Sequence, residues 1–175
     1  MELLTEPICD PYFMGDEPVV VIEMEGGQEI RIELYPFAAP ITVSYFLTLV
    51  NEGFYDGLQF HRLAPNFVLQ GGDPTGTGDG ETEYYLKGEF AENGVDNPLL
   101  HTAGALSMAR QEGCDTASCQ FFIMLRNAPA LDGHYAAFGH AIDGMDVIEE
   151  LAATPVDENA VPVTPLVMKR VYIEG

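Results

Sequence analysis

The sequence predicts a mainly β fold, a closed eight-stranded antiparallel barrel capped by two α-helices. Three features lead to this prediction. About eight short apolar runs are bounded by Gly, Pro, Asn or Asp, only two stretches show helical periodicity, and the two kinds of element do not alternate regularly. Regular βα alternation is typical of a doubly wound parallel sheet, so its absence favours an antiparallel barrel. The 18 glycines and 12 prolines agree with many turns and short elements.

The chain has 175 residues, which suits one domain with a sizeable core. We expect that core to begin near Pro18, so that residues 1–17 form an N-terminal extension and residues 18–175 the barrel domain. The first ten residues contain no Lys or Arg and reach Pro7 before any long apolar run, which is unlike a secretory signal. No apolar stretch approaches the roughly 20 residues that a membrane-spanning helix needs.

The composition is strongly acidic, with 7 basic residues against 28 acidic ones and a formal net charge of −21. We therefore expect neither nucleic acid nor a membrane as a partner, because binding to nucleic acid or to an acidic membrane surface depends on Lys and Arg. Such a surface favours solubility and repulsion between copies, so we expect a monomer with a mild preference for basic peptides. The cysteines are only 3, an odd number, which predicts reduced thiols and a cytoplasmic location.

The first two predicted strands form a hairpin. Residues 19–24 and 29–34 are separated by Gly26 and Gly27, which supply the positive φ angles of a tight turn. Apolar and charged residues alternate strictly in the second run, which predicts a strand with one buried face. The other predicted strands lie near residues 59–63, 67–71, 104–109, 120–125, 136–141 and 166–173.

Two amphipathic helices complete the predicted fold. Pro40 suits the first position of a helix, and apolar residues follow it at helical spacing, namely Val43, Phe46, Leu47 and Val50. A second helix is predicted after Gly144 by the same periodicity. Residues 71–80 and 81–103 should form long, ordered surface loops, and such loops on a rigid barrel commonly carry function.

The glycine-rich stretch 71–80 does not match a phosphate or calcium site. It lacks the Lys and the helix N-terminus of a phosphate loop, and it contains Asp73 and Asp79 instead. The spacing of these acids differs from that of a calcium-binding loop. Tight backbone turns are the simpler interpretation of the glycines.

Metal and nucleophile chemistry are also disfavoured. No two histidines stand at ligand spacing with Cys114 and Cys119, so we predict no metal and no cofactor; the histidines are His61, His101, His134 and His140. Ser107 and Ser118 lack the strained Gly-x-Ser-x-Gly turn, and nothing in the sequence pairs either serine with a His and a carboxylate.

Three short predicted strands each carry an apolar and a polar residue on one face. At a strand period of two, the pairs are Phe60 with Arg62, Val68 with Gln70, and Gln120 with Phe122. A single pair of this kind is usually a core aromatic beside an ordinary surface polar residue. The specific signal lies in the combination and order of the three pairs.

These strands belong to a longer series of motifs that resembles the cyclophilins, a family of peptidyl-prolyl cis-trans isomerases. The motifs are Phe60-His-Arg62, Pro65-x-Phe67, Gln70-Gly-Gly-Asp73, Gly76-Thr-Gly78, Gly104-Ala-Leu-Ser-Met-Ala109, Gln120-Phe-Phe-Ile123, Leu131-Asp-Gly133 and Phe138-Gly139. The resemblance covers about residues 18 to 173. It implies a cyclophilin-like eight-stranded antiparallel barrel closed by two helices, in agreement with the strand and helix patterns.

The resemblance also implies roles for the site residues. Arg62 would be the catalytic residue, and Gln70 and Gln120 would position the peptide. The pocket for the proline ring would be walled by Phe67, Val68, Phe122 and Leu131. The edge that hydrogen-bonds the residue before proline would consist of Ala109, Arg110 and Gln111. Tyr135 stands where a pocket-rim His is common and offers an aromatic face and a hydroxyl donor.

Two departures from the family pattern carry expectations of their own. Ala130 stands where the best-known members have a Trp that binds cyclosporin, so we expect weak cyclosporin binding. Arg110 replaces a smaller Asn, which predicts a preference for acidic residues near the substrate proline.

The leading hypothesis is an active isomerase that acts on proline-containing peptides and on unfolded or folding proteins. The alternative is a proline-peptide-binding or chaperone module in which turnover is incidental. Arg62 favours the enzyme, whereas Ala130 and the acidic surface leave room for specialised binding. A third possibility, a structural barrel without a ligand, leaves the matched polar residues without a purpose.

Overall fold

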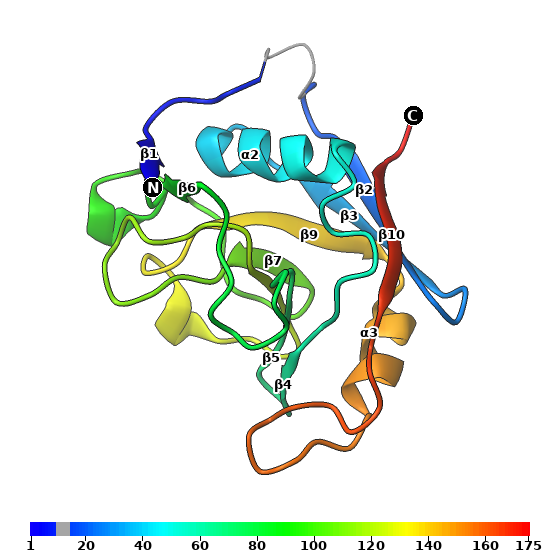
Figure 1. The fold of residues 1–175 in the computed structure, drawn as a ribbon. Coiled ribbons are helices and arrows are strands. Elements are labelled where there is room, and N and C mark those ends of the chain that lie inside the picture. Colours follow the sequence, from blue (N-terminus) through cyan, green and yellow to red (C-terminus); the bar gives the residue numbers. More distant parts are fainter. Residues whose placement is uncertain (10–14) are drawn as a thin grey trace.

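The fold is known from a computed structural model, which describes residues 1–9 and 15–175. Eight strands form one antiparallel sheet in the order β10-β2-β3-β9-β7-β8-β5-β4 (Figure 1). The strands are β2 (Val19–Met24), β3 (Glu29–Leu34), β4 (Arg62–Ala64), β5 (Val68–Gly71), β7 (Ala105–Met108), β8 (Phe121–Met124), β9 (Ala137–Asp143) and β10 (Met168–Ile173). Each overlaps a run that the sequence predicts as a strand, so the predicted fold class is confirmed.

The barrel is less fully closed than predicted. Its edge strands β4 and β10 share no ladder among the described residues, and the two edges meet through an isolated bridge between Gln59 and Val167. Continuing that antiparallel register would set Pro165 opposite His61, and a proline has no N–H to donate to a ladder. The sheet is therefore a strongly curled half-barrel.

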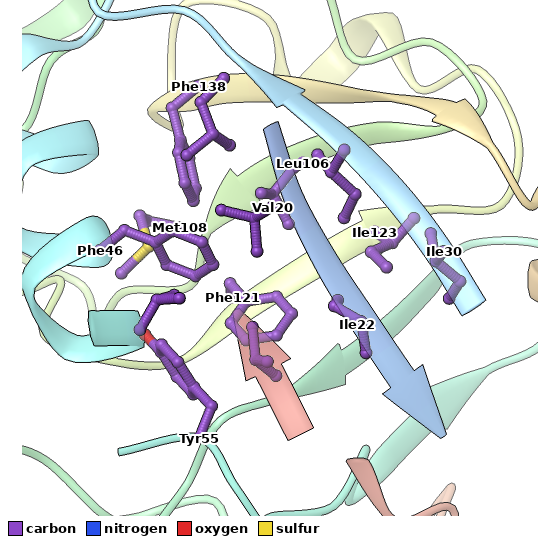
Figure 2. Close-up of a cluster of buried hydrophobic side chains, with 14 of the residues drawn as sticks. Val20, Ile22, Ile30, Phe46, Tyr55, Leu106, Met108, Phe121, Ile123 and Phe138 are labelled. Atoms are coloured by element: carbon purple, nitrogen blue, oxygen red, sulfur yellow. The ribbon is translucent and has the colours of Figure 1, made fainter. Parts of the chain in front are cut away.

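The interior of the sheet is filled by alternate strand residues and by a group of aromatic rings. Val20 and Ile22 of β2 are fully buried beside Ile30 of β3, as the period of two predicts (Figure 2). The aromatic rings Phe46, Tyr55, Phe121 and Phe138 meet in the same core (Figure 2). The centroid of the Phe46 ring lies 5.1 Å from that of Phe138 and 5.5 Å from that of Phe121, both in edge-on geometry.

The two predicted helices are present as α2 (Pro40–Asn51) and α3 (Met145–Ala152). Helix α2 has no side-chain cap of its own and is capped from a distant loop. The carboxylate of Glu89 accepts hydrogen bonds from the backbone N–H groups of Ile41 and Thr42, at 3.1 and 2.7 Å. Within the described residues, neither helix is long and apolar enough to span a membrane.

Two short strands lie outside the predicted set. β1 (Glu2–Leu4) runs parallel to β6 (Tyr84–Leu86), and the backbone N–H of Ile8 donates to the Ser44 hydroxyl at 3.0 Å. The first residues of the predicted extension therefore pack on the barrel. Neither of these strands lies in one of the bounded apolar runs by which the sequence predicts the other eight. Residues 10–14, which belong to the same predicted extension, lie outside the described residues.

Candidate active site

The sheet register aligns three of the predicted site residues in one row. Arg62 of β4 pairs with Gln70 of β5, and Gln70 pairs with Phe122 of β8. Directly paired residues point to the same side of a sheet. Their neighbours Leu63 and Phe121 are fully buried in the barrel core, so the row projects from the opposite, outer face.

A chain of hydrogen bonds runs along this outer face and anchors the arginine. The Arg62 Nη1 donates to Gln70 Oε1 at 3.3 Å, and Gln70 Nε2 donates to Gln120 Oε1 at 2.9 Å. Gln120 Nε2 then donates to the backbone carbonyls of Gly78 and Gly80, both at 3.0 Å. A backbone carbonyl can only accept hydrogen bonds, so each Gln in this chain must donate through its Nε2 and accept through its Oε1. The Arg62 guanidinium is therefore held on one side by an acceptor whose orientation is fixed.

The guanidinium stands at a pocket of about 220 Å³. The lining residues are Arg62, Phe67, Val68, Gln70, Ala109, Arg110, Phe122, Leu131 and Tyr135, all of them predicted site residues. Val68 and Phe122 are buried at its base, whereas Phe67 is 38% exposed. The cavity therefore combines an apolar base with the anchored Arg62 guanidinium, and Arg110 contributes a second cation to its lining.

The two remaining predicted residues, Gln111 and Gln120, line an adjoining pocket of about 240 Å³. Both pockets are bordered by Gln70, Ala109 and Arg110. The structure thus divides the predicted site residues between two neighbouring hollows. The thiol of Cys119 also lines the second pocket, but burial raises its pKa to about 12, so it remains protonated at neutral pH.

The glycine-rich loop that ends the hydrogen-bond chain is organised by Asp73. This buried carboxylate accepts bonds from the Thr75 N–H at 2.7 Å and from the Gly78 N–H at 2.5 Å. Burial opposes ionisation of Asp73, but these bonds outweigh it and lower the pKa of the carboxyl group. Asp73 therefore serves the turn. No group of three or more His, Cys, Asp or Glu that could hold a metal ion occurs among residues 1–9 and 15–175.

A second hydrogen-bonded chain, which the sequence did not reveal, lies behind the pocket. His101 Nε2 is 2.9 Å from the Ser107 hydroxyl, and His101 Nδ1 is 3.0 Å from Asp132 Oδ1. The expectation that Ser107 is not paired with a His and a carboxylate is therefore wrong. Ser107 is nevertheless 0% exposed, so no substrate reaches it and a nucleophilic role is excluded.

The buried chain supports the base of the pocket. Ser107 is the register partner of Phe122, and the His101 ring stacks on Phe122 with centroids 6.2 Å apart. Asp132 directly follows the pocket residue Leu131, in the turn after the short helix η2 (Pro129–Leu131). The three members come from separate parts of the chain without a motif, so only the folded sheet brings them together.

The burial of His101 predicts a pH dependence of stability. Burial lowers the pKa of His101 below its ordinary value of about 6.5, although Asp132 acts in the opposite direction. The unfolded chain therefore takes up a proton that the folded state refuses. We expect the free energy of unfolding to fall as pH drops below about 6.5, by up to about 1.4 kcal/mol per pH unit until the folded-state pKa is reached.

Urea unfolding followed by circular dichroism between pH 7 and 5 tests this prediction by comparing the protein with His101→Gln. The variant should lose stability less steeply on acidification. His61, whose pKa burial also lowers, and Glu89, whose pKa burial raises, titrate in both proteins, so the difference isolates His101. Parallel pH profiles for the two proteins are the result that contradicts this assignment.

Comparison with known proteins identifies a family and several relatives. The family model described as "Cyclophilin type peptidyl-prolyl cis-trans isomerase/CLD" matches residues 19–173. A peptidyl-prolyl cis-trans isomerase of Schizosaccharomyces pombe is 46% identical over 139 residues, which cover 79% of this chain and 88% of the relative. Peptidyl-prolyl cis-trans isomerase B of Bacillus subtilis is 45% identical over 152 residues, covering 87% and 95%.

Solved structures with the same fold include a cyclophilin-type peptidyl-prolyl cis-trans isomerase of Cryptosporidium parvum. It superposes with a TM-score of 0.84 at 32% sequence identity, covering 91% of this chain and 98% of that protein. A second structure of the parasite protein was determined in the presence of the dipeptide Ala-Pro and has a TM-score of 0.83.

Proposed function

This chain belongs to the family of cyclophilin-type peptidyl-prolyl cis-trans isomerases, and on that premise we propose that Arg62 accelerates rotation about X–Pro bonds while the apolar pocket holds the proline ring. The observation that carries the proposal is the Arg62 guanidinium, anchored by Gln70 at a pocket whose base is formed by the buried Val68 and Phe122. The chain is a peptidyl-prolyl cis-trans isomerase by its family, and the residue roles given below are our inference.

The chemical problem is a rotation barrier. The X–Pro amide is conjugated, and turning it costs about 18–20 kcal/mol because the twisted transition state loses that conjugation. The proline nitrogen becomes pyramidal in the twisted amide and gains a lone pair. A catalyst must therefore bind the twisted amide more tightly than either planar form.

Arg62 can meet this requirement without transferring a proton. A guanidinium remains charged at any relevant pH and has five N–H donors in a planar fork, only part of which the bond to Gln70 uses. One of the other donors can bond the lone pair of the twisted amide nitrogen, and another can hold the proline carbonyl. The Gln70–Gln120 chain keeps the fork in one orientation, so little reorganisation accompanies the reaction.

The apolar base of the pocket contributes through its polarity. The twisted amide is less polar than the planar one, so burial against Val68 and Phe122 favours it. A hydrogen bond from Arg62 is also stronger beside an apolar wall than in water. An acceleration of about 10⁵-fold requires roughly 7 kcal/mol, which the charged bond, desolvation and restraint of the rotating chain can share.

We infer that the substrates are proline-containing peptides and unfolded or folding proteins, whose slow steps include X–Pro isomerisation. The solved structure of the Cryptosporidium parvum relative in the presence of Ala-Pro supports recognition of a proline peptide. Assistance to folding is the consequence of that activity on a chain that has not yet buried its prolines.

A protease-coupled assay on a series of proline tetrapeptides tests the proposed function. The protease cleaves only the trans peptide, so an isomerase shortens the slow phase that reports the cis form. We expect the purified protein to accelerate this phase in proportion to its concentration. An unchanged slow phase for every residue before proline, together with measurable peptide binding, supports the alternative of a binding or chaperone module.

A further inference from the structure

Arg110 presents little of its charge to the pocket that it lines. Its side chain is only 11% exposed. The central guanidinium carbon lies 4.8 Å from the centroid of the Tyr135 ring and 5.1 Å from that of Phe90. Both distances are within the range of cation–π attraction, so two aromatic rings hold the guanidinium.

The nitrogens of the same guanidinium also have internal partners. Arg110 Nε donates to the His134 carbonyl at 2.9 Å, and Nη2 lies 3.7 Å from a carboxylate oxygen of Glu92. Nη1 donates to the carbonyls of Gln111 and Glu112, both at 3.0 Å. The expectation that Arg110 selects acidic substrates requires a free cation, and these contacts favour another role.

Through these contacts Arg110 joins two sides of the candidate site. One side is the edge from Ala109 to Gly113, whose carbonyls at 111 and 112 accept its bonds. The other side is Tyr135, whose ring also contacts the Phe122 ring edge-on, with the two centroids 5.8 Å apart. The Tyr135 ring is therefore held between the Arg110 guanidinium and the base of the pocket.

We propose that Arg110 is a positioning residue, which fixes Tyr135 and the 109–113 edge in the arrangement that receives the peptide and does not itself select the substrate's charge. This inference rests on the proposed function. Residues 111–113 are exposed, and besides the Arg110 bonds the Thr116 hydroxyl holds residues 111 and 113. Removing the guanidinium would leave this edge less ordered before the peptide binds. Ordering a loop on binding lowers affinity, whereas a preformed edge avoids that cost.

The proposal predicts a specific kinetic signature for Arg110→Met, which keeps an unbranched apolar stem and removes the charged fork. An edge that binds the planar and twisted peptide equally affects KM and leaves kcat unchanged. We expect KM to rise about 5- to 20-fold with kcat within about twofold of the unchanged protein. The rise should be equal for peptides with Glu, Ala or Lys beside the proline; a loss confined to the Glu peptide would instead assign Arg110 to substrate selection.

A double-mutant cycle with Tyr135→Leu tests whether Arg110 acts through that ring. If the two residues act together, Arg110→Met should raise KM by clearly less in the Tyr135→Leu background than in the unchanged protein. Equal factors in both backgrounds contradict action through Tyr135. Arg126→Met, which removes an exposed ion pair with Glu149 at 2.8 Å, is the matched control and should leave KM unchanged.

Two further measurements keep the outcome decisive. Should Arg110→Met fail to fold, Arg110→Lys carries the same test, because lysine keeps the charge but cannot reproduce the planar fork. Peptide affinity measured by calorimetry follows the same pattern as KM and does not depend on turnover. If the unchanged protein binds peptide but does not isomerise it, the proposed function is refuted and the positioning role of Arg110 is not. If both Arg110 variants bind peptide with unchanged affinity, the positioning role is refuted.

Discussion

Arg62→Ala is expected to lower kcat/KM for proline peptides by about 100- to 1000-fold, which corresponds to about 3–4 kcal/mol of lost transition-state stabilisation. The physical reason is that Arg62 is the cation anchored by the Gln70 side chain at the pocket that we propose holds the proline ring. The variant should fold normally, because Arg62 projects from the outer face of a three-residue edge strand and is only partly buried. Protease-coupled kinetics and thermal unfolding by calorimetry measure the two effects separately.

Arg62→Lys and Arg126→Ala complete this experiment. Lysine keeps the charge but loses the planar fork that can bond nitrogen and carbonyl together, so its activity should fall less than that of the alanine variant. Arg126 lies in an exposed ion pair with Glu149, and its removal should not change turnover. Full turnover by Arg62→Ala would remove Arg62 from the mechanism.

Ala130→Trp is expected to tighten cyclosporin binding by roughly 30- to 1000-fold and to leave peptide turnover nearly unchanged. Ala130 is exposed in the short helix η2, directly before the pocket residue Leu131. An alanine offers neither an aromatic face nor an N–H donor there, and an indole supplies both. A buried aromatic contact with one hydrogen bond is worth about 2–4 kcal/mol, which gives the expected factor.

Ala130→Phe separates the two contributions of the indole, because phenylalanine adds a ring without the N–H. Calorimetry with cyclosporin should rank the affinities as Trp above Phe above Ala, while the three proteins should isomerise a proline tetrapeptide at similar rates. Tight drug binding by the unchanged protein, or no gain in the Trp variant, would mean that this position does not control drug affinity.

The main strands and both helices could be predicted from the sequence because their signals are local. Alternation in 29–34, the glycines at 26 and 27, and Pro40 at the first position of α2 each lie within a few residues of the element they specify. The parallel pair β1 and β6 had no such signal, since neither strand lies in a bounded apolar run and each has its partner about 80 positions away.

The candidate site also has features that the sequence predicts and features that only the folded sheet provides. The identities of Arg62, Gln70 and Phe122 follow from the motif resemblance, and the strand period correctly pairs Val68 with Gln70 and Gln120 with Phe122. The predicted pairing of Phe60 with Arg62 on one face is wrong, because Phe60 lies before β4 and is buried in the barrel core against Phe121. Their arrangement as one row depends on the register between β4, β5 and β8, which no single strand contains. The sequence thus specifies which residues form the site, and the pairing of the strands in the sheet specifies how they are aligned.

What the sequence by itself determined is therefore the fold class, the strands of the main sheet, both helices and, through the motif resemblance, the set of pocket residues. The tertiary structure alone decided three contacts: the Glu89 cap on α2, the His101–Ser107 bond behind Phe122, and the enclosure of the Arg110 guanidinium by Tyr135 and Phe90. Propensity and periodicity act between residues a few positions apart, so they can be read along the chain. Contacts such as these join side chains from separate loops and strands, and they exist only once the sheet register has fixed where each backbone lies.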